Sequence, residues 1–539
     1  MQRMNNSTYE RRLHALDQAG AGPLLRGSLM GLEKEGLRVA PDGTIATTPH
    51  PAKLGSALTH PHITTDFSEA LLELVTPALD DAAAVLDLLR DLHLFCYRHL
   101  GDELIWGASM PCIIGGGASV PLARYGTSNA ATMKTVYRRG LGNRYGRVMQ
   151  TIAGVHFNFS VAEGLWPLLA DLEDTGGEPL AFRSDRYMGL VRNLQRIGWL
   201  VPYLFGASPA VCRSFVANRP TDLVAFDSNT LYHPYATSLR MGDIGYQNRQ
   251  EEGTGMKASY DSLDAYIRSL TWAIETPCPL YEQIGVKVGN RWEQLNDHVL
   301  QIENEYYSTV RPKQLADWME RPTLALRRRG IAYIELRSLD VNAFDPLGID
   351  AEQMRFLCCL MFYCLLSESP RIDARERRLI DGNEVLAAHR GREPGLRLEH
   401  ATDGLVPLTQ WADTVLDQVL GIAELLDGYT DGPHAAAVRA QQAKIANPEL
   451  TPSARMLAAM RDADQGFATF ACRLSEQHRD WFRAQPLDPG RNAWLEALTA
   501  RSHRRQARIE AADQIDFDEF MRRYFAQSEH RPVELHPPA

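Results

Sequence analysis

Apolar and polar residues alternate along four short segments in the first two-thirds of the chain, and a period of two is typical of β-strands. The segments are residues 31–39, 63–76, 152–160 and 331–339. A fifth, weaker alternation covers residues 300–307. Together they predict an antiparallel sheet, because the strands of such sheets commonly alternate between a core face and a polar face.

Helical periodicity is also present and dominates the last third of the chain. Residues 80–100 predict a helix with one apolar face, made of Val85, Leu88, Leu89, Leu92 and Phe95. Asp350 is a candidate N-cap for an apolar helix, and the Pro452-Ser453 pair predicts the start of another. Residues 501–523 predict one charged helix with a thin apolar stripe. The last residues, ending at Ala539, are predicted to be disordered.

No internal repeat or low-complexity linker divides the chain. We therefore expect one unit over residues 1–539, with a sheet-bearing part at about 28–350 and a mainly helical part at about 351–539 packed on it. This is an α+β organisation. The longest apolar run, residues 356–366, is much shorter than the roughly 20 residues that cross a bilayer. It predicts a buried helix.

Composition narrows the class of protein. The 539 residues are 45% apolar and 23% charged, which is ordinary for a globular protein. The net charge of -10 argues against a nucleic-acid binder. Residues 1–8 are polar and lead into a charged stretch without an apolar signal region, so a cytoplasmic protein without membrane association is expected.

The cysteines and glycines carry no familiar cofactor motif. The eight cysteines are scattered without a CxxC pair, which favours buried free thiols over a metal site, with a catalytic cysteine as the alternative. The glycines at 115–117 lack the lysine and hydroxyl of a P-loop. A nucleotide, if bound, would be held without a P-loop or Rossmann turn.

The polar faces of the predicted strands are acidic. The residues on these faces are Glu33 and Glu35, then Asp66 and Glu73, then His156 and Asn158, then Glu335 and Arg337, and in the weaker segment Gln301, Glu303 and Glu305. The simpler interpretation is a half-solvated sheet with its charges in water and a structural histidine. Acidic residues are depleted in strands, however, and the glycines Gly36 and Gly154 suggest a close approach of backbone or ligand.

If the acidic faces converge, their carboxylates repel one another unless cations lie between them. Hard divalent cations such as Mg²⁺ take oxygen ligands and relieve that repulsion. A histidine and an arginine among several carboxylates therefore indicate a multi-metal site for phosphate chemistry. The spacing of the residues does not indicate a substrate.

The same segments resemble a known family. The motifs are GLEKEGLRV at 31–39, TTDFSEALLELVTP at 64–77, YGTSN at 125–129, QTIAGVHFNFS at 150–160, PYLFGASP at 202–209, YATSLR at 235–240, LQIENE at 300–305, RPK at 311–313 and YIELRSLD at 333–340. They resemble, in order, the proteobacterial type of glutamate–cysteine ligase. Beyond residue 350 the likeness is weaker, apart from NPELT at 447–451 and SAR at 453–455.

The resemblance implies a fold and an activity. The implied fold is a curved antiparallel sheet of glutamine-synthetase-like type, surrounded by helices and followed by a helical C-terminal third. The implied enzyme activates the γ-carboxylate of glutamate with ATP, forms an acyl phosphate, and transfers the γ-glutamyl group to the amine of cysteine in the first step of glutathione synthesis. The cofactor implied is Mg²⁺, with Mn²⁺ as an alternative. A monomer with feedback by glutathione is expected.

The resemblance also implies roles for particular residues. The metal-site positions are Glu33, Glu35, Asp66, Glu73, His156 and Glu335. Arg337 corresponds to an arginine near the transferred phosphate, and with Glu73 it is a candidate catalytic residue. The positions lining the cysteine site are Tyr137, Arg138, Ile152, Arg240, Tyr246 and Tyr307. The alternative interpretation is that these tyrosines are ordinary core residues and these arginines are ordinary surface residues.

The chain departs from the family pattern at two places. Residues 247–262 do not follow it, and Gly36 stands where a threonine is expected. Two other functions are considered: a related ligase that uses a different amine, and a silent binding protein of the same fold. The first would lack the small-thiol pocket and the second would lack metal carboxylates or Arg337, and all of these residues are present. The residue that accepts the amine's proton is not identified.

Overall fold

A single antiparallel sheet lies at the centre of the molecule. The computed structural model describes residues 7–173, 178–217, 219–245 and 256–528. Seven strands of these residues pair in the order β11-β12-β5-β1-β3-β2, with β4 on β1. Their bounds are β1 Leu29–Val39, β2 Ile63–Thr65, β3 Leu71–Val75, β4 Leu104–Ile105, β5 Val155–Ser160, β11 Val310–Lys313 and β12 Tyr333–Leu339. The predicted antiparallel sheet is confirmed.

The pairing register brings the acidic positions to one face. Glu35 lies opposite Glu73 in the β1–β3 pair, and Glu33 lies opposite His156 in the β1–β5 pair. Directly opposed residues in an antiparallel pair point to the same side of the sheet. The acidic faces predicted separately for each strand therefore form one surface.

Two predicted strands have different bounds in the structure. Residues 63–76 form two short strands, β2 and β3, because the chain turns back between them and pairs with itself. Residues 300–307 were wrongly predicted as a strand: Glu303–Glu305 is a 3₁₀ helix. The buried carboxylates there are fixed by ion pairs, Glu303 with Arg321 at 3.1 Å and Glu305 with Arg144 at 2.9 Å. These pairs account for the acidic alternation without a strand.

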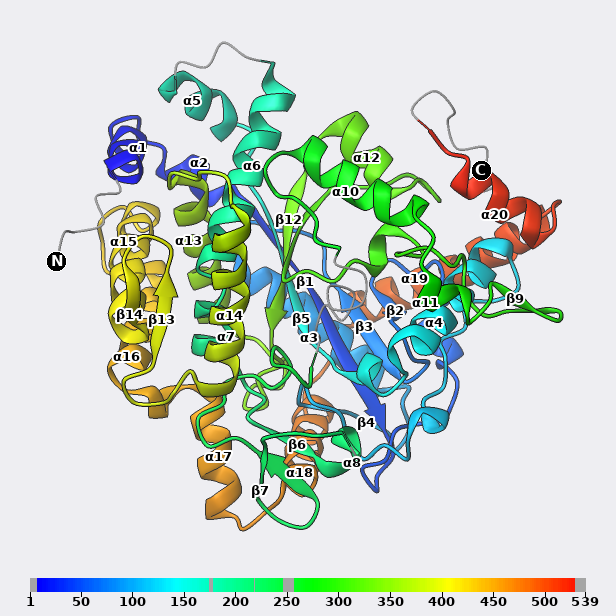
Figure 1. Ribbon diagram of the computed structural model, residues 1–539. Helices are drawn as coiled ribbons and strands as arrows, with labels where there is room; N and C mark the ends of the chain where they lie inside the picture. The colour runs from blue at the N-terminus through cyan, green and yellow to red at the C-terminus, as the bar shows by residue number, and fades with distance from the viewer. Residues whose placement is uncertain (1–6, 174–177, 218, 246–255, 529–539) are drawn as a thin grey trace.

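Helices cover both faces of the sheet (Figure 1). Those before residue 350 are α1 Ser7–Gln18, α2 Gly22–Arg26, α3 Ala82–Tyr97, α4 Asn129–Tyr145, α5 Leu165–Leu172, α6 Pro179–Arg196, α7 Leu200–Phe205, α8 Arg213–Val216, α10 Leu263–Glu275, α11 Pro279–Glu282 and α12 Pro322–Arg329. Those after it are α13 Ala351–Leu366, α14 Ala374–Arg390, α15 Leu408–Leu426, α16 Pro433–Ala446, α17 Pro452–Asp462, α18 Phe467–Arg483, α19 Pro489–Ala512 and α20 Phe517–Phe525.

Three small sheets complete the secondary structure of the described residues. Their strands are β6 Ala210–Cys212, β7 Val224–Ala225, β8 Thr230–Tyr232, β9 Lys287–Val288, β10 Arg291–Trp292, β13 Arg397–His400 and β14 Gly404–Pro407.

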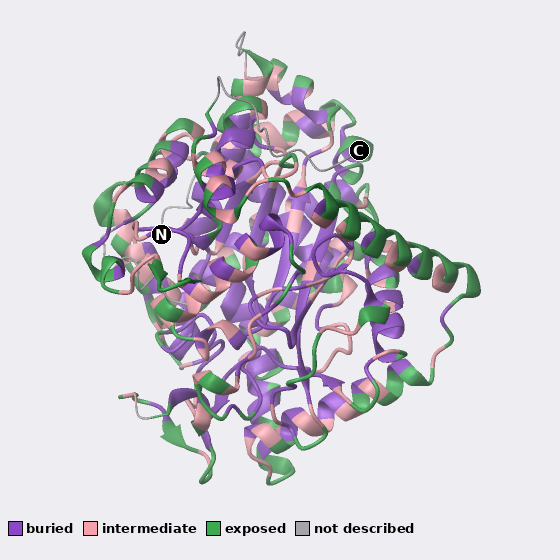
Figure 2. Cartoon of the chain, turned by 90° about the vertical axis from the view of Figure 1, so that its right-hand side faces the viewer, coloured by how far each residue is buried: buried purple, intermediate pink, exposed green. Residues whose placement is uncertain are grey.

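The apolar core lies behind the sheet. Phe157 and Phe159 of β5 are fully buried, and Phe159 packs edge-on against Phe362 of α13 with ring centroids 5.2 Å apart. Helices α13, α15 and α16 stack on one another on this side, whereas α4 and α20 lie on the other side of the sheet (Figure 1). Buried residues concentrate in the sheet and on the inner faces of the helices (Figure 2). The acidic face of the sheet is therefore the face opposite this apolar core.

The helix predictions are confirmed apart from one. Asp81 caps α3, the Asp350 carboxylate accepts a hydrogen bond from the Gln353 amide at 2.7 Å, and α17 begins at Pro452. The single helix predicted over residues 501–523 is wrong, because α19 ends at Ala512 and α20 starts at Phe517. Asp516 caps α20, and an N-cap residue has non-helical backbone angles, so the two helices are separate.

The cysteine prediction is confirmed, since all eight are free thiols and only Cys472 is not fully buried. No helix of the described residues is both long and apolar enough to span a membrane. The predicted disorder of the last residues lies outside the described residues.

Candidate functional site

A cavity of about 500 Å³ opens between the acidic face of the sheet and helix α4. Strands β1, β3, β5 and β12 supply its floor through Glu33, Glu35, Glu73, His156, Glu335 and Arg337. Helix α4 supplies the opposite wall, with Tyr137 and Arg138 among its lining residues. The carboxylates that were predicted to converge therefore line one cavity.

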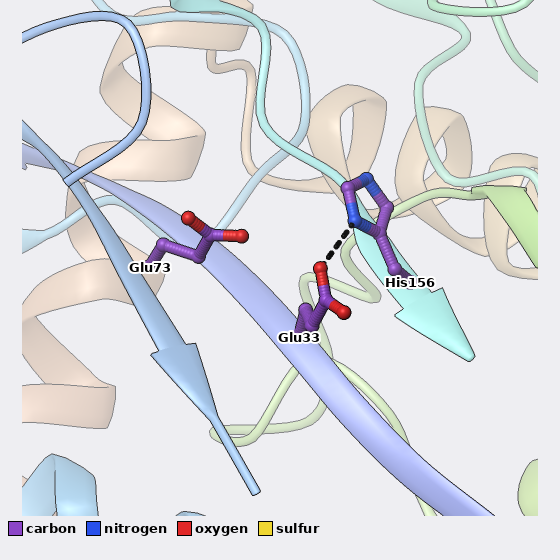
Figure 3. A group of neighbouring side chains, drawn as sticks. All are labelled: Glu33, Glu73 and His156. Carbon is purple, nitrogen blue, oxygen red and sulfur yellow. Dashed lines mark hydrogen bonds and ion pairs between the residues drawn. The ribbon is translucent and has the colours of Figure 1, made fainter. Parts of the chain in front are cut away.

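Three side chains form the centre of the acidic group. Ligand atoms of Glu33, Glu73 and His156 all lie within 4.8 Å of one another (Figure 3). His156 Nδ1 lies 3.2 Å from Glu33 Oε2 and 3.7 Å from Glu335 Oε1, and its Nε2 lies 3.9 Å from Glu35 Oε1. One imidazole thus stands among carboxylates from β1 and β12.

Burial and neighbouring charges shift the pKa values of the carboxylates in this group. Burial, and then the negative charges of Glu33 and Asp66, raise the pKa of Glu73 well above its ordinary value. Burial likewise raises the pKa of Glu35. Burial and the negative charge of Glu335 act to raise the pKa of Glu33, but the hydrogen bond and charge of His156 together with the charge of Lys313 outweigh them, so the pKa is lowered. Burial and the proximity of like charges therefore make full ionisation of Glu35 and Glu73 unfavourable.

The β11–β12 side of the cavity is cationic. Lys313 Nζ lies 3.6 Å from Glu335 Oε2, and Arg337 lies 3.3 Å from Glu335 Oε1. Burial acts to raise the pKa of Glu335, but the charges of Lys313 and Arg337 hold it far below its ordinary value. Glu335 is therefore ionised, and the two cations paired with it also line the cavity.

The residues present fit a divalent cation. The buried Glu335 Oε2 has no hydrogen-bond partner among the described residues, and the same holds for Asn158 Oδ1. Buried oxygens without partners are uncommon unless an ion or water satisfies them. The set of carboxylate oxygens with one imidazole is of the kind that binds Mg²⁺ or Mn²⁺.

Arg240 reaches the cavity from the segment before residue 245. Its guanidinium donates to the backbone carbonyl of Arg337 at 2.7 Å and passes directly over Gly154. A Cβ on Gly154 would lie 2.2 Å from the guanidinium nitrogen. The close approach suggested by this glycine is therefore to a side chain, whereas Gly36 is filled from the other face by Ile105.

Comparison with known proteins agrees with this geometry. The family model for glutamate-cysteine ligase matches residues 13–386. A glutamate–cysteine ligase of Alcanivorax borkumensis is 48% identical over 522 residues, covering 96% of this chain and 99% of the relative. The chain belongs to the glutamate–cysteine ligase family. It is therefore a ligase, as the motifs predicted.

Solved structures show the same family and fold. A crystal structure of glutamate–cysteine ligase from Francisella tularensis in complex with AMP matches with a TM-score of 0.87 and 35% identity, covering 93% of this chain and 97% of that one. A bifunctional glutathione synthetase from Pasteurella multocida matches with a TM-score of 0.68 at 24% identity, covering 87% of this chain and 55% of that one, which shows a shared fold. The α+β fold expected for this glutamate–cysteine ligase family member is confirmed.

Most residues predicted for the ligase site line the cavity. All six metal-site positions do so, and Asp66 also pairs with Arg138 at 3.6 Å. Of the positions predicted to bind cysteine, Tyr137, Arg138, Arg240 and Tyr307 line it as well. Ile152 is fully buried and does not line the cavity, and Tyr246 lies outside the described residues.

Sequence reasoning missed three cations of the ligase cavity, which are Lys134 of α4 and Arg311 and Lys313 of β11. Arg311 and Lys313 are two apart on β11 and point to the same face as Glu335, which lies opposite Arg311. Their alternation around Pro312 was the signal that could have identified them. It was too short, at four strand residues, to be read as a strand with a face.

Proposed function

We propose that this ligase joins the γ-carboxylate of glutamate to the amine of cysteine, using ATP and Mg²⁺ through a γ-glutamyl phosphate. One observation carries the proposal: five carboxylates, of which two are buried and three half-buried, and a buried histidine share a cavity with the cations of Lys313 and Arg337. Such a site suits a reaction in which negative charge moves between a carboxylate and phosphates.

The metal would be held by Glu33, Glu73 and His156, with Glu35, Asp66 and Glu335 around them. Mg²⁺ bound there would neutralise the carboxylates and the phosphate oxygens facing them. The raised pKa of Glu73 supports this assignment, because the position accepts a full negative charge poorly without added positive charge.

The phosphates would lie beside Arg337 and Lys313. A glutamate γ-carboxylate oxygen attacks the γ-phosphorus of ATP and ADP departs. Arg337 is half-buried and its guanidinium is paired with Glu335, so it can stabilise the transferred phosphoryl group with little reorganisation. The relative from F. tularensis was solved in complex with AMP, which supports an adenine nucleotide as a ligand of this chain.

Cysteine would bind beside Arg240. The cysteine amine attacks the acyl carbon, phosphate leaves with the bonding electrons, and the nitrogen loses a proton. Arg240 and Arg138 can pair with the cysteine carboxylate, while Tyr137 and Tyr307 enclose its short side chain.

The test is ADP release with Mg²⁺, ATP and glutamate, with and without cysteine, followed by mass analysis of the product. Glu33→Gln keeps the shape of the side chain and removes one charge of the proposed metal set. We expect a rate at least about 100-fold lower, since several kcal/mol of charge stabilisation are lost. Glu163→Gln, at an exposed ion pair with Arg183, is the matched control and should keep the wild-type rate.

Measuring ADP release with a panel of amines in place of cysteine identifies the amine substrate. Stimulation by cysteine above other amines, with a product of γ-glutamylcysteine mass, supports the proposal. Stronger stimulation by another amine would preserve the chemistry and overturn cysteine as substrate. Absence of turnover with every amine would contradict the proposed reaction.

A further inference from the structure

A second group of metal-ligating side chains lies outside the active-site cavity. Ligand atoms of Asp222, Asp243 and His389 all lie within 4.8 Å of one another. Asp222 precedes strand β7, Asp243 lies between β8 and α10, and His389 is near the end of helix α14. None of the three lines the active-site cavity, so they form a separate group.

A second histidine lies beside this group. The imidazole rings of His233 and His389 have centroids 6.5 Å apart and planes tilted by 57°. Two imidazoles bound to one tetrahedral ion, with metal–nitrogen bonds of about 2 Å, would have centroids about 5 Å apart. His233 is half-buried, and a small movement of its ring would bring it to an ion held by the other three side chains. Two imidazoles and two carboxylates are a ligand set that suits a four-coordinate ion such as Zn²⁺.

His389 is held closely against the segment that contains Asp243. Its Nε2 lies 2.9 Å from Asp243 Oδ1 and accepts from the Asp243 amide at 3.0 Å. A Cβ on Gly242 would lie 2.2 Å from the same nitrogen, so the ring packs directly on the backbone. The Thr237 amide donates to the Ala388 carbonyl at 2.9 Å and fastens the same two parts of the chain. An ion bound at Nε2 would replace the amide hydrogen bond and keep the Asp243 carboxylate as its neighbour.

The protonation states of the group favour a cation. The hydrogen bond with His389 lowers the pKa of Asp243, which keeps this carboxylate ionised. Burial lowers the pKa of His233, with Asp222 opposing that effect, so the imidazole is neutral at neutral pH. Carboxylates and neutral imidazoles are the forms that bind metal ions. Asp222 is exposed and forms no ion pair with any residue that the structure describes, so its carboxylate is open to an ion.

We propose that a transition-metal ion such as Zn²⁺ binds between two imidazoles and two carboxylates, those of His233, His389, Asp222 and Asp243. Imidazole nitrogen favours such ions, whereas the carboxylate-rich active-site cavity suits Mg²⁺. The bound ion joins the end of α14 to the loop before β7 and to the segment that carries Arg240. The site lies outside the cavity, so the inference does not depend on the proposed ligase reaction.

The test is calorimetric titration of the chelator-treated, full-length protein with Zn²⁺. The active-site cavity also offers an imidazole and carboxylates, so the wild type should show two classes of Zn²⁺ site. In Asp222→Asn one class should weaken at least about tenfold, because one of its four ligands is lost, while the other class is unchanged. His233→Asn should weaken the same class. Asp403→Asn is the matched control and should keep both classes, because Asp403 lies 3.7 Å from His400 but belongs to no group of three ligands among the described residues.

His156→Asn identifies the class that belongs to the active-site cavity, and it should weaken the class that Asp222→Asn leaves intact. Because Asp222 is exposed, Asp222→Asn should fold and keep its Mg²⁺-dependent ADP release. Two unchanged classes in Asp222→Asn, or a wild type with a single class that His156→Asn removes, would overturn the inference. A wild-type enzyme without cysteine-stimulated ADP release would instead contradict the proposed function and leave the Zn²⁺ result unaffected.

Discussion

Asp340 connects the end of β12 to the segment that carries Arg240. Its buried carboxylate accepts hydrogen bonds from the Ser208 hydroxyl at 2.6 Å and the Ser238 hydroxyl at 2.9 Å, and lies 3.8 Å from the Arg240 guanidinium. Burial raises the pKa of Asp340, with Arg240 opposing that effect. A buried carboxylate with this many partners orients the side chains around it.

Asp340→Asn should therefore misplace Arg240. The amide keeps the volume but removes the negative charge beside the guanidinium and adds donors where acceptors are needed. If Arg240 binds the cysteine carboxylate, the KM for cysteine should rise about tenfold, from a loss of about 1.5 kcal/mol, with a smaller effect on the KM for ATP. Initial rates against each substrate measure this. Asp403→Asn, at a half-exposed carboxylate, is the control, and a uniform fall in kcat with unchanged KM values would contradict the prediction.

At the scale of elements, two glycines of the sheet have different roles: one makes room for a side chain of the cavity and the other for a side chain of the core. Gly154, immediately before β5, leaves space for Arg240, whereas Gly36 within β1 leaves space for Ile105 on the opposite face. A Cβ on Gly36 would lie 2.5 Å from Ile105 Cγ2. The two positions are close in the sheet yet face different surroundings.

Gly154→Ala and Gly36→Ala form a matched pair. Gly154→Ala displaces the Arg240 guanidinium and should raise the KM for cysteine about tenfold or more. Gly36→Ala overpacks the core and should lower the free energy of unfolding by about 1–3 kcal/mol with little change in any KM. Substrate kinetics and urea denaturation of both variants measure the contrast. Equal effects of the two variants on the KM for cysteine would count against Arg240 as a cysteine-binding residue.

The elements also differ in how well the sequence predicted them. The carboxylates of β1 and β12 were placed on the correct faces because alternation in a strand needs only local sequence. Helix α13 and its Asp350 cap were equally local. The strand predicted around Glu303 and Glu305 was wrong, because carboxylates held in buried ion pairs with Arg321 and Arg144 give the same alternation as the charged face of a strand.

At the scale of the whole molecule, the C-terminal helices hold distant loops. Ser502 of α19 accepts from the Thr59 hydroxyl at 2.6 Å, so it fixes the loop that contains His60. His60 Nδ1 accepts hydrogen bonds from the amides of His62 at 3.1 Å and Ile63 at 2.9 Å. Burial, and then the charge of His62, lower the pKa of His60 to about 4.

This histidine predicts a loss of stability in acid. The unfolded chain binds a proton at His60 below a pH of about 6.5, whereas the folded protein does so only near pH 4. The free energy of unfolding should therefore fall as pH falls from about 6.5 to about 4, by up to about 3 kcal/mol. His60→Asn keeps an acceptor and does not titrate, so it should flatten this slope in urea titrations at pH 7 and pH 5. His14→Asn, at an exposed histidine, is the control, and equal slopes in all three proteins would contradict the prediction.

The amino-acid sequence by itself determined which residues of each strand share a face, which helices are capped and where, and the motifs of the ligase family. These depend on a few neighbouring residues and on the period of the backbone. Only the tertiary structure decided that Glu35 faces Glu73, that Arg240 lies over Gly154, and that Tyr524 of the C-terminal helix α20 lines the cavity. Strand register and the packing of segments hundreds of residues apart depend on the free energy of the whole core, which no local pattern contains.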